Sequence, residues 1–135
     1  MALDIQQREH EGVTILDLKG RITVGPEAGA LRERVAALVA ASTKNLVLNL
    51  KNIDYIDSTG LGAVVMCATS MRKNQGNVRL LNLTKRNIEL LIMTKLATVF
   101  EIFNDEQDAV NSFFPDRKIK TFDILSFVQD MKNED

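Results

Sequence analysis

The feature that most constrains the fold of this chain is a regular alternation of apolar strand-like segments with amphipathic helical ones. Residues 46–50 are nearly all apolar on both faces, which is typical of a buried parallel strand. Elsewhere, apolar residues such as Leu31, Val35 and Leu38 recur at helical spacing. We expect five strands and four core helices. The strands are residues 3–9, 13–22, 46–50, 78–83 and 99–103, and the helices are residues 27–41, 61–72, 85–94 and 105–114.

The order of these elements predicts the fold class. The first two strands are separated by a turn at residues 10–12, so they form an N-terminal hairpin. Counted from the second strand, the order is βαβαβαβα. This alternation predicts an α/β protein, with helices packed on one mixed sheet that has parallel connections.

Pro115 divides the chain into a core and a C-terminal extension. A length of 135 residues favours one domain, and it is long enough to bury a core without disulfides. We expect the domain to span residues 1–114 and the extension 115–135, with a helix at residues 121–132. The apolar residues on one face of that helix are Ile124, Phe127, Val128 and Met131. We expect this stripe to pack on the same domain or on a second copy, in a homodimer.

The composition excludes several classes of protein. The net charge is −1, so no overall field favours nucleic acid or an anionic membrane. The single cysteine, Cys67, cannot form an internal disulfide, and we interpret it as a core residue, like Met66, Met71 and Met93. There is no secretory signal pattern, and no apolar run approaches the roughly 20 residues that span a bilayer. We expect a soluble, cytoplasmic protein that neither binds nucleic acid nor inserts into a membrane.

The candidate site is the junction between the strand at residues 46–50 and the helix at residues 61–72. Its sequence is Asp57-Ser58-Thr59-Gly60-Leu61-Gly62. A helix start presents unpaired backbone N–H groups and the positive end of the helix dipole. Ser58 is a suitable N-cap residue for that helix. A phosphate there would meet these donors on one side and the Asp57 carboxylate on the other, which indicates a switch rather than a reaction centre.

Catalytic interpretations of this junction are less well supported. Ser58 as a plain helix cap is the simplest alternative, and a phosphoserine at a helix start is compatible with it. As a hydrolytic nucleophile, Ser58 would need a base. The only histidine, His10, lies in a predicted turn exposed to solvent, and the junction is not a G-x-S-x-G elbow. Asp54 and Asp57 could form an acid/base pair, but we interpret them as exposed loop acids because no substrate pocket is predicted.

Two further alternatives concern phosphate and nucleotide chemistry. Asp57 would be the acceptor of a receiver domain only beside an acidic cluster that holds Mg²⁺, and the first strand offers no acidic pair. Gly60 and Gly62 could cradle a nucleotide phosphate, but without a following Lys-Ser or Lys-Thr the signal is weak. Glycine early in a helix more often permits close approach of another backbone. We therefore expect no enzymatic activity, no cofactor and no metal site.

With this order of elements and this junction, the chain resembles the anti-sigma factor antagonists, which are built on the STAS domain. The resemblance covers roughly residues 3–114. It departs from the commonest family pattern at Thr59, where a second serine is frequent. It also departs after Gly20, where Arg21-Ile22-Thr23 stands in place of a stretch that often holds an acidic residue. Further supporting segments are Gly20-Arg21-Ile22, Leu48-Asn49-Leu50, Leu80-Leu81-Asn82-Leu83-Thr84 and residues 95–103.

The resemblance implies a STAS fold and a phosphorylation switch. In that family a serine kinase that is also the anti-sigma factor phosphorylates the serine after the aspartate, and a separate phosphatase removes the phosphate. The unphosphorylated form binds the anti-sigma factor and releases the sigma factor. By resemblance, Ser58 is the phosphorylation site, with Thr59 as a minor alternative. The partner-binding residues would be Asp57, Ser58, Thr59, Gly60, Leu61 and Gly62.

The same resemblance carries an alternative without a switch. STAS domains also serve as subunits of stress-signalling assemblies and as accessory subunits of lipid-transport ATPases. A neighbouring anti-sigma kinase gene would support the switch, whereas neighbouring transporter genes would support a fixed subunit.

Overall fold

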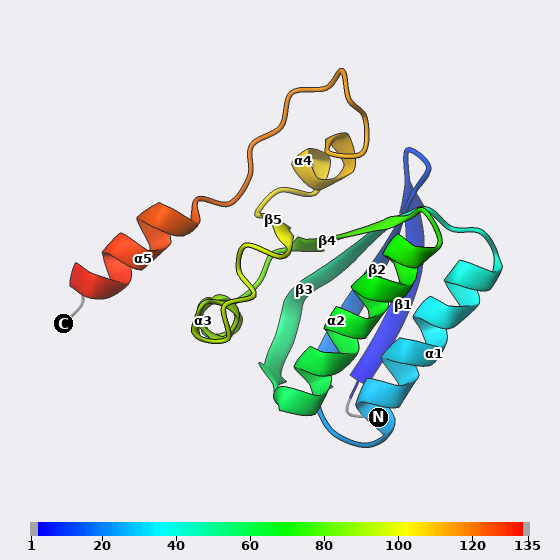
Figure 1. Ribbon diagram of the computed structural model, residues 1–135, viewed down its shortest axis with the longest axis horizontal. Coiled ribbons are helices and arrows are strands. Elements are labelled where there is room, and N and C mark those ends of the chain that lie inside the picture. Colours follow the sequence, from blue (N-terminus) through cyan, green and yellow to red (C-terminus); the bar gives the residue numbers. More distant parts are fainter. Residues whose placement is uncertain (1–2, 134–135) are drawn as a thin grey trace.

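The computed structural model describes residues 3–133, which form one five-stranded sheet with helices on both of its faces (Figure 1). The strand order along the sheet is the order along the chain, from β1 to β5. β1 is antiparallel to β2, and each later neighbour is parallel. The strands are β1 (Leu3–His10), β2 (Val13–Ile22), β3 (Asn45–Ile56), β4 (Asn77–Leu81) and β5 (Glu101–Phe103). The predicted fold class is confirmed.

Side-chain alternation along the strands divides the interior between the two faces of the sheet. In β3, Leu46 and Leu48 belong to the large core, whereas Val47 belongs to a smaller one on the other face. The large core also receives the apolar faces of α1 (Pro26–Ala40), α2 (Ser58–Lys73) and α3 (Lys85–Met93). The smaller core is covered by α4 (Glu106–Asn111). In Figure 1, α1 and α2 lie side by side across the sheet.

β3 is longer than the apolar pattern predicts. We expected a strand at residues 46–50, but it continues to Ile56, through the exposed residues Lys51, Asn52 and Asp54. Its second half pairs with β2 alone, with Ile22 opposite Ile56. A strand with one unpaired side tolerates polar residues, so apolar content underestimates its length.

The turn after α2 also differs from expectation. Glycine is the residue that most often adopts the left-handed conformation after a helix, but here that residue is Gln75, with φ of 60°. Gly76 serves a different purpose, because a Cβ on it would lie 2.8 Å from the carbonyl oxygen of Lys44. A close approach between two segments, rather than the backbone angle, therefore requires glycine here.

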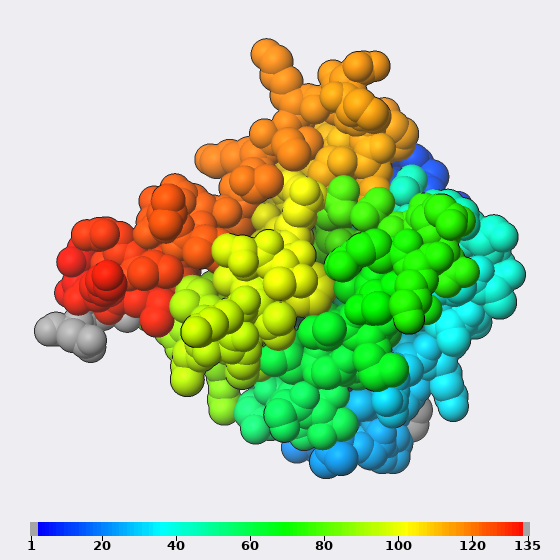
Figure 2. Space-filling model, in the orientation of Figure 1, coloured from blue at the N-terminus to red at the C-terminus, as the bar shows by residue number. Residues whose placement is uncertain are grey.

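The C-terminal extension forms the predicted helix, α5 (Ile124–Asn133), at the end of the molecule opposite α1 (Figures 1 and 2). The Phe122 N–H donates to the Ile102 carbonyl of β5 (2.8 Å), so the extension runs along that edge strand. Ile124 and Phe127 pack against the large core, and the other two residues of the stripe are half-buried. The stripe therefore packs on its own domain in part. The boundary at residue 114 and the homodimer stay predictions.

Candidate functional site

Asp57, and not Ser58, caps the helix that follows β3. The Gly60 N–H donates to Asp57 Oδ1 (2.7 Å), and Ser58 is the first residue of α2. The other carboxylate oxygen, Oδ2, accepts from the Val24 N–H in the loop before α1 (2.9 Å). The prediction of Ser58 as the N-cap is therefore wrong. A carboxylate offers two oxygens, so Asp57 can bind the helix start and a second loop at once, which a hydroxyl would do less well.

These backbone donors hold Asp57 in its charged form. The Gly60 N–H, then the Val24 N–H, and with a smaller effect the Thr59 N–H, keep the pKa of the Asp57 carboxyl below its ordinary value. The Gly60 N–H, one of the donors that we expected a phosphate to meet, is thus already bound to a carboxylate. Asp57 positions Ser58 and places a fixed negative charge beside it.

Two glycines of the junction have different environments. A Cβ on Gly60 would lie 1.7 Å from the carbonyl oxygen of Ile22, so α2 begins against the end of β2 only because this residue is glycine. The Ile22 carbonyl also accepts from the Asp57 N–H (3.3 Å). Around Gly62, by contrast, a Cβ would meet nothing within 4 Å. The close approach expected of an early helical glycine is made within the chain by Gly60, whereas Gly62 leaves the surface open.

The exposed side of the junction is narrower than the six predicted residues. Ser58, Thr59 and Gly62 are exposed, whereas Gly60 and Leu61 are buried. Among residues 3–133, the Ser58 hydroxyl has no hydrogen-bond partner. The structure does not test which of the six residues bind a partner.

The exposed face of α2 continues beyond Gly62 to Met66. Met66 is one helical turn further along and is 57% exposed, so its assignment to the core is wrong. The same holds for Met93, which is 78% exposed, whereas Met71 and Cys67 are buried as predicted. The apolar character of methionine does not reveal which side of a helix the rest of the chain covers.

A cleft of about 300 Å³ lies beside Ser58, between the end of β3 and α3. Besides Ser58, its lining includes Tyr55, Arg86 and Met93. The Arg86 guanidinium lies over the Tyr55 ring, 4.8 Å from its centroid. Tyr55 and Arg86 are not among the site residues predicted from the sequence, because no local pattern links residues on different elements of the fold.

The buried residue Asn87 fixes α3 beside this cleft. It is 1% exposed, and its side-chain amide donates to the Ile53 carbonyl of β3 (3.1 Å). Its backbone N–H also donates to the hydroxyl oxygen of Thr84, the residue that caps α3 (3.3 Å). Arg86 therefore projects from a helix that is anchored next to Tyr55.

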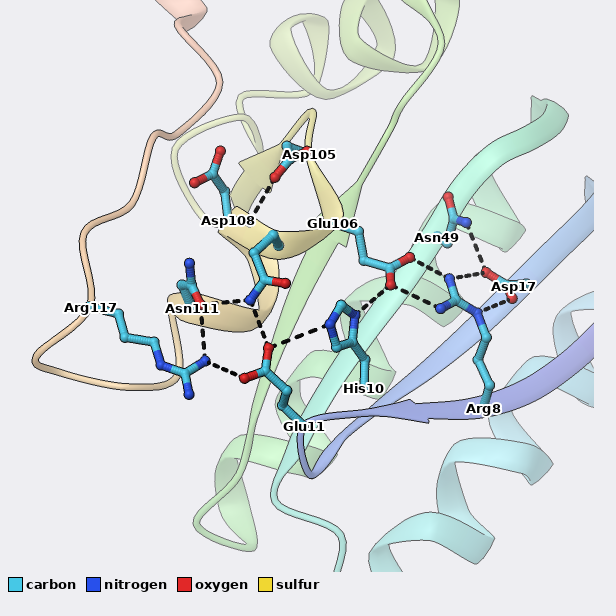
Figure 3. A network of polar contacts seen from close by, with 11 residues as sticks. Arg8, His10, Glu11, Asp17, Asn49, Asp105, Glu106, Asp108, Asn111 and Arg117 are labelled. Carbon is cyan, nitrogen blue, oxygen red and sulfur yellow. Dashed lines mark hydrogen bonds and ion pairs between the residues drawn. The ribbon is translucent and has the colours of Figure 1, made fainter.

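His10 belongs to a polar network that joins the first hairpin to α4 (Figure 3). It is the half-buried last residue of β1, and its Nδ1 lies 2.6 Å from Glu106 of α4, so the expected solvated turn histidine is wrong. Arg8 joins the same Glu106 to Asp17 of β2. His10 pairs with Val13 at the start of β2, whereas Asp57 contacts Ile22 at the end of that strand. Val13 and Ile22 are nine residues apart, which corresponds to about 30 Å along a strand. His10 therefore cannot act as a base for Ser58.

The structure also bears on the predicted exposure of Asp54, on metal binding and on membrane spans. Asp54 is exposed as predicted, but it lies within β3 rather than in a loop. No group of three His, Cys, Asp or Glu side chains in residues 3–133 is placed to hold a metal ion. In the same part of the chain, no helix has the length and apolar character that a membrane span needs.

Comparison with known protein families identifies the fold family. The family model described as "STAS domain" matches residues 4–109, from the hairpin to α4. The chain belongs to the STAS domain family. The predicted family is thereby confirmed, and residues 110–135 lie beyond the matched range.

Curated relatives of this STAS domain carry the names of regulators of sigma factors. The anti-sigma-B factor antagonist of Bacillus subtilis is 32% identical over 102 residues, which are 76% of this chain and 92% of that protein. The anti-sigma-F factor antagonist RsfB of Mycobacterium tuberculosis is 28% identical over 120 residues, covering 86% of this chain and 96% of its own length.

Solved structures agree on the fold. An anti-sigma factor antagonist from Mycobacterium paratuberculosis superposes with a TM-score of 0.66 at 24% identity, covering 82% of this chain and 92% of that one. The anti-sigma factor antagonist SpoIIAA in its unphosphorylated form gives a TM-score of 0.71 at 14% identity, covering 85% of this chain and all of that one. At such low identity, these matches support the architecture of the STAS domain alone.

Proposed function

We propose that this STAS domain is an anti-sigma factor antagonist that is switched by phosphorylation of Ser58. A serine kinase that is also the anti-sigma factor would be the partner of the unmodified form and would phosphorylate it. A phosphatase would restore binding, and the cycle would take place in the cytoplasm. The names of the relatives support the antagonist role, and the geometry of the junction supports the switch.

The observation that carries the proposal is the state of Ser58. Its side chain is exposed at the first residue of α2, and its hydroxyl is not engaged by any described residue. Phosphorylation there disrupts no packing, because the helix is capped by Asp57 and not by the serine. A kinase can therefore reach the hydroxyl without unfolding the start of the helix.

The partner-binding surface would follow the exposed face of α2. Ser58, Gly62 and Met66 recur at four-residue spacing and are all exposed. The open space above Gly62 allows a partner backbone to approach closely, and Met66 offers an adaptable apolar contact. Thr59 lies at the edge of this surface. Gly60 and Leu61 are buried, so they would contribute only by holding the start of α2 against the sheet.

Charge would provide the switch. Phosphorylation adds about −1.5 to −2 charges to Ser58, directly beside the ionised Asp57. An interface that excludes water from uncompensated charge loses affinity, and a loss of about 1.4 kcal/mol already weakens binding tenfold. No large rearrangement of the domain is required.

Mass spectrometry after incubation with the cognate kinase tests the site of modification. We expect the phosphate on Ser58, a Ser58→Ala protein that accepts little or none, and a Thr59→Ala protein that is phosphorylated almost normally. Phosphate on another residue, with Ser58 unmodified, would contradict the proposal. No phosphorylation at any residue would favour the non-switching STAS subunit instead.

Titration calorimetry with the purified kinase tests the consequence for binding. Ser58→Ala should bind with the affinity of the unmodified protein, and Ser58→Asp at least about tenfold more weakly. Gln7→Glu, at an exposed position of β1, is the control for a charge added outside the α2 surface, and it should bind like the unmodified protein. Equal affinities for Ser58→Ala and Ser58→Asp would argue against a charge switch at this residue.

A further inference from the structure

A phosphoryl group on Ser58 would stand at a helix start that already binds a carboxylate. Asp57 Oδ1 accepts the Gly60 N–H, and the Thr59 N–H also helps to keep this carboxylate charged. The phosphate would therefore lie beside a fixed negative charge that shares the positive end of the helix with it. A side-chain cation would offset the repulsion between these two charges.

Arg86 is the cation placed to do so. It lines the same cleft of about 300 Å³ as Ser58, and it is the only lysine or arginine among the described residues of that lining. Arg86 is exposed and forms no ion pair with a described residue, although Glu89 also lines the cleft. Its recorded contact is the stacking over the Tyr55 ring.

The surroundings hold the Arg86 backbone in place and leave its side chain exposed to solvent. Asn87 ties α3 to β3 through the buried bond to Ile53, so the Arg86 backbone keeps its place beside the junction. The stacking on an exposed tyrosine is weak, whereas a bidentate bond between guanidinium and phosphate is charge-assisted and geometrically matched. A phosphoryl group in the cleft would compete successfully for the guanidinium.

We propose that Arg86 is the phosphate-binding residue for phosphorylated Ser58. The guanidinium leaves the Tyr55 ring and binds two phosphoryl oxygens across the cleft. This inference rests on the proposed function in one respect, namely that Ser58 carries the phosphate. It adds a second element to the switch, because the move of Arg86 changes the surface formed by Tyr55 and the exposed Met93.

The experiment uses full-length protein with phosphoserine installed at position 58 during translation, so no kinase is needed. Tyr55 is the only tyrosine, and the chain has no tryptophan, so tyrosine fluorescence reports on the ring under Arg86 alone. The ³¹P NMR titration gives the second pKa of the phosphate, which a nearby cation lowers. Arg86→Gln and Arg86→Lys are compared with Arg72→Gln, a control at the far end of α2.

We expect phosphorylation to change Tyr55 emission in the parent protein and in Arg72→Gln, but much less in Arg86→Gln. Arg86→Gln should raise the midpoint of the ³¹P titration by about half a pH unit, and Arg86→Lys by less. Equal midpoints and equal emission changes in the parent and Arg86→Gln proteins would overturn the proposal. So would a shift caused by Arg21→Gln instead, since Arg21 pairs with Tyr55 across the sheet.

The two proposals fail separately. If the kinase leaves Ser58 unmodified, the proposed function fails, although the installed phosphoserine still reports whether Arg86 binds it. If the kinase modifies Ser58 but the Arg86 variants titrate like the parent, only the assignment of Arg86 fails.

Discussion

The contact between Gly60 and Ile22 should make the start of α2 intolerant of any side chain. In Gly60→Ala the new Cβ would lie 1.7 Å from the Ile22 carbonyl oxygen, whereas a carbon and an oxygen ordinarily approach to about 3.3 Å. α2 and β2 would have to separate by roughly 1.6 Å, the difference between those distances. That movement disrupts the bond from the Asp57 N–H to the Ile22 carbonyl, which is already 3.3 Å long.

The resulting loss of stability can be estimated from overpacking. Such substitutions in a well-packed interior typically lower the free energy of unfolding by about 1–3 kcal/mol, and backbone contacts relax less than side chains. We expect Gly60→Ala to lose about 3 kcal/mol. The matched control is Gly62→Ala, two residues along the same helix, where a Cβ meets nothing within 4 Å. There the substitution should gain about 0.5–1 kcal/mol, because alanine restricts the unfolded chain and favours the helix.

Urea denaturation followed by far-ultraviolet circular dichroism measures both values on full-length protein. The two variants should differ by about 4 kcal/mol, the sum of the expected loss and gain. A loss below about 1 kcal/mol in Gly60→Ala would show that α2 can move away from β2 without penalty, and would refute the reasoning. An equal loss in both variants would instead show that glycine is needed for the helix as a whole.

Three further predictions concern the network at α4 and the C-terminal extension. Hydrogen bonds from Arg8, and then from His10, lower the pKa of Glu106 to about 2, so its contribution to stability is present above about pH 4.5 and is lost as the pH falls towards 2. Urea denaturation should show Glu106→Gln losing this pH dependence, roughly 1 kcal/mol after solvent screening, and an unchanged slope would contradict the assignment. Phe127→Ala should lower stability by about 1–2 kcal/mol, whereas Leu125→Ala, at an 83% exposed position, should change it by less than about 0.5 kcal/mol. Truncation after Phe114 should leave a folded core with a lower melting temperature, and complete unfolding would show that the core depends on the extension.

Much of the fold follows from local pattern. β2 begins and ends at the predicted residues, and α3 differs by one residue, because apolar periodicity and clear turn signals mark both. The predicted bounds of the strands are wrong where contacts with distant parts of the chain, rather than neighbouring residues, determine the structure. The second half of β3 is polar and is held as a strand by β2, and β5 shortens to three residues at the edge of the sheet.

The candidate site was located by the sequence but not described by it. Asp57 and Ser58 stand together at a helix start, as predicted, because the change from strand to helix period is visible in the chain. The sequence did not reveal that Asp57, and not Ser58, caps the helix. The reason is that the second hydrogen bond that Asp57 accepts comes from the Val24 N–H, 33 residues earlier. A cap that also binds a distant loop is favoured over a local cap only after the loop has been brought into place.

The sequence by itself determined the order of the elements, the α/β class, the junction that carries Ser58 and the helix in the extension. Each of these depends on periodicity or on residues that are neighbours in the chain. The tertiary structure alone decided that Gly60 lies against Ile22, that Met66 and Met93 are exposed, and that Arg86 shares a cleft with Ser58. These facts depend on which surfaces meet when helices pack on a sheet. Residues far apart in the sequence then become neighbours, and no local sequence pattern predicts which of them come into contact.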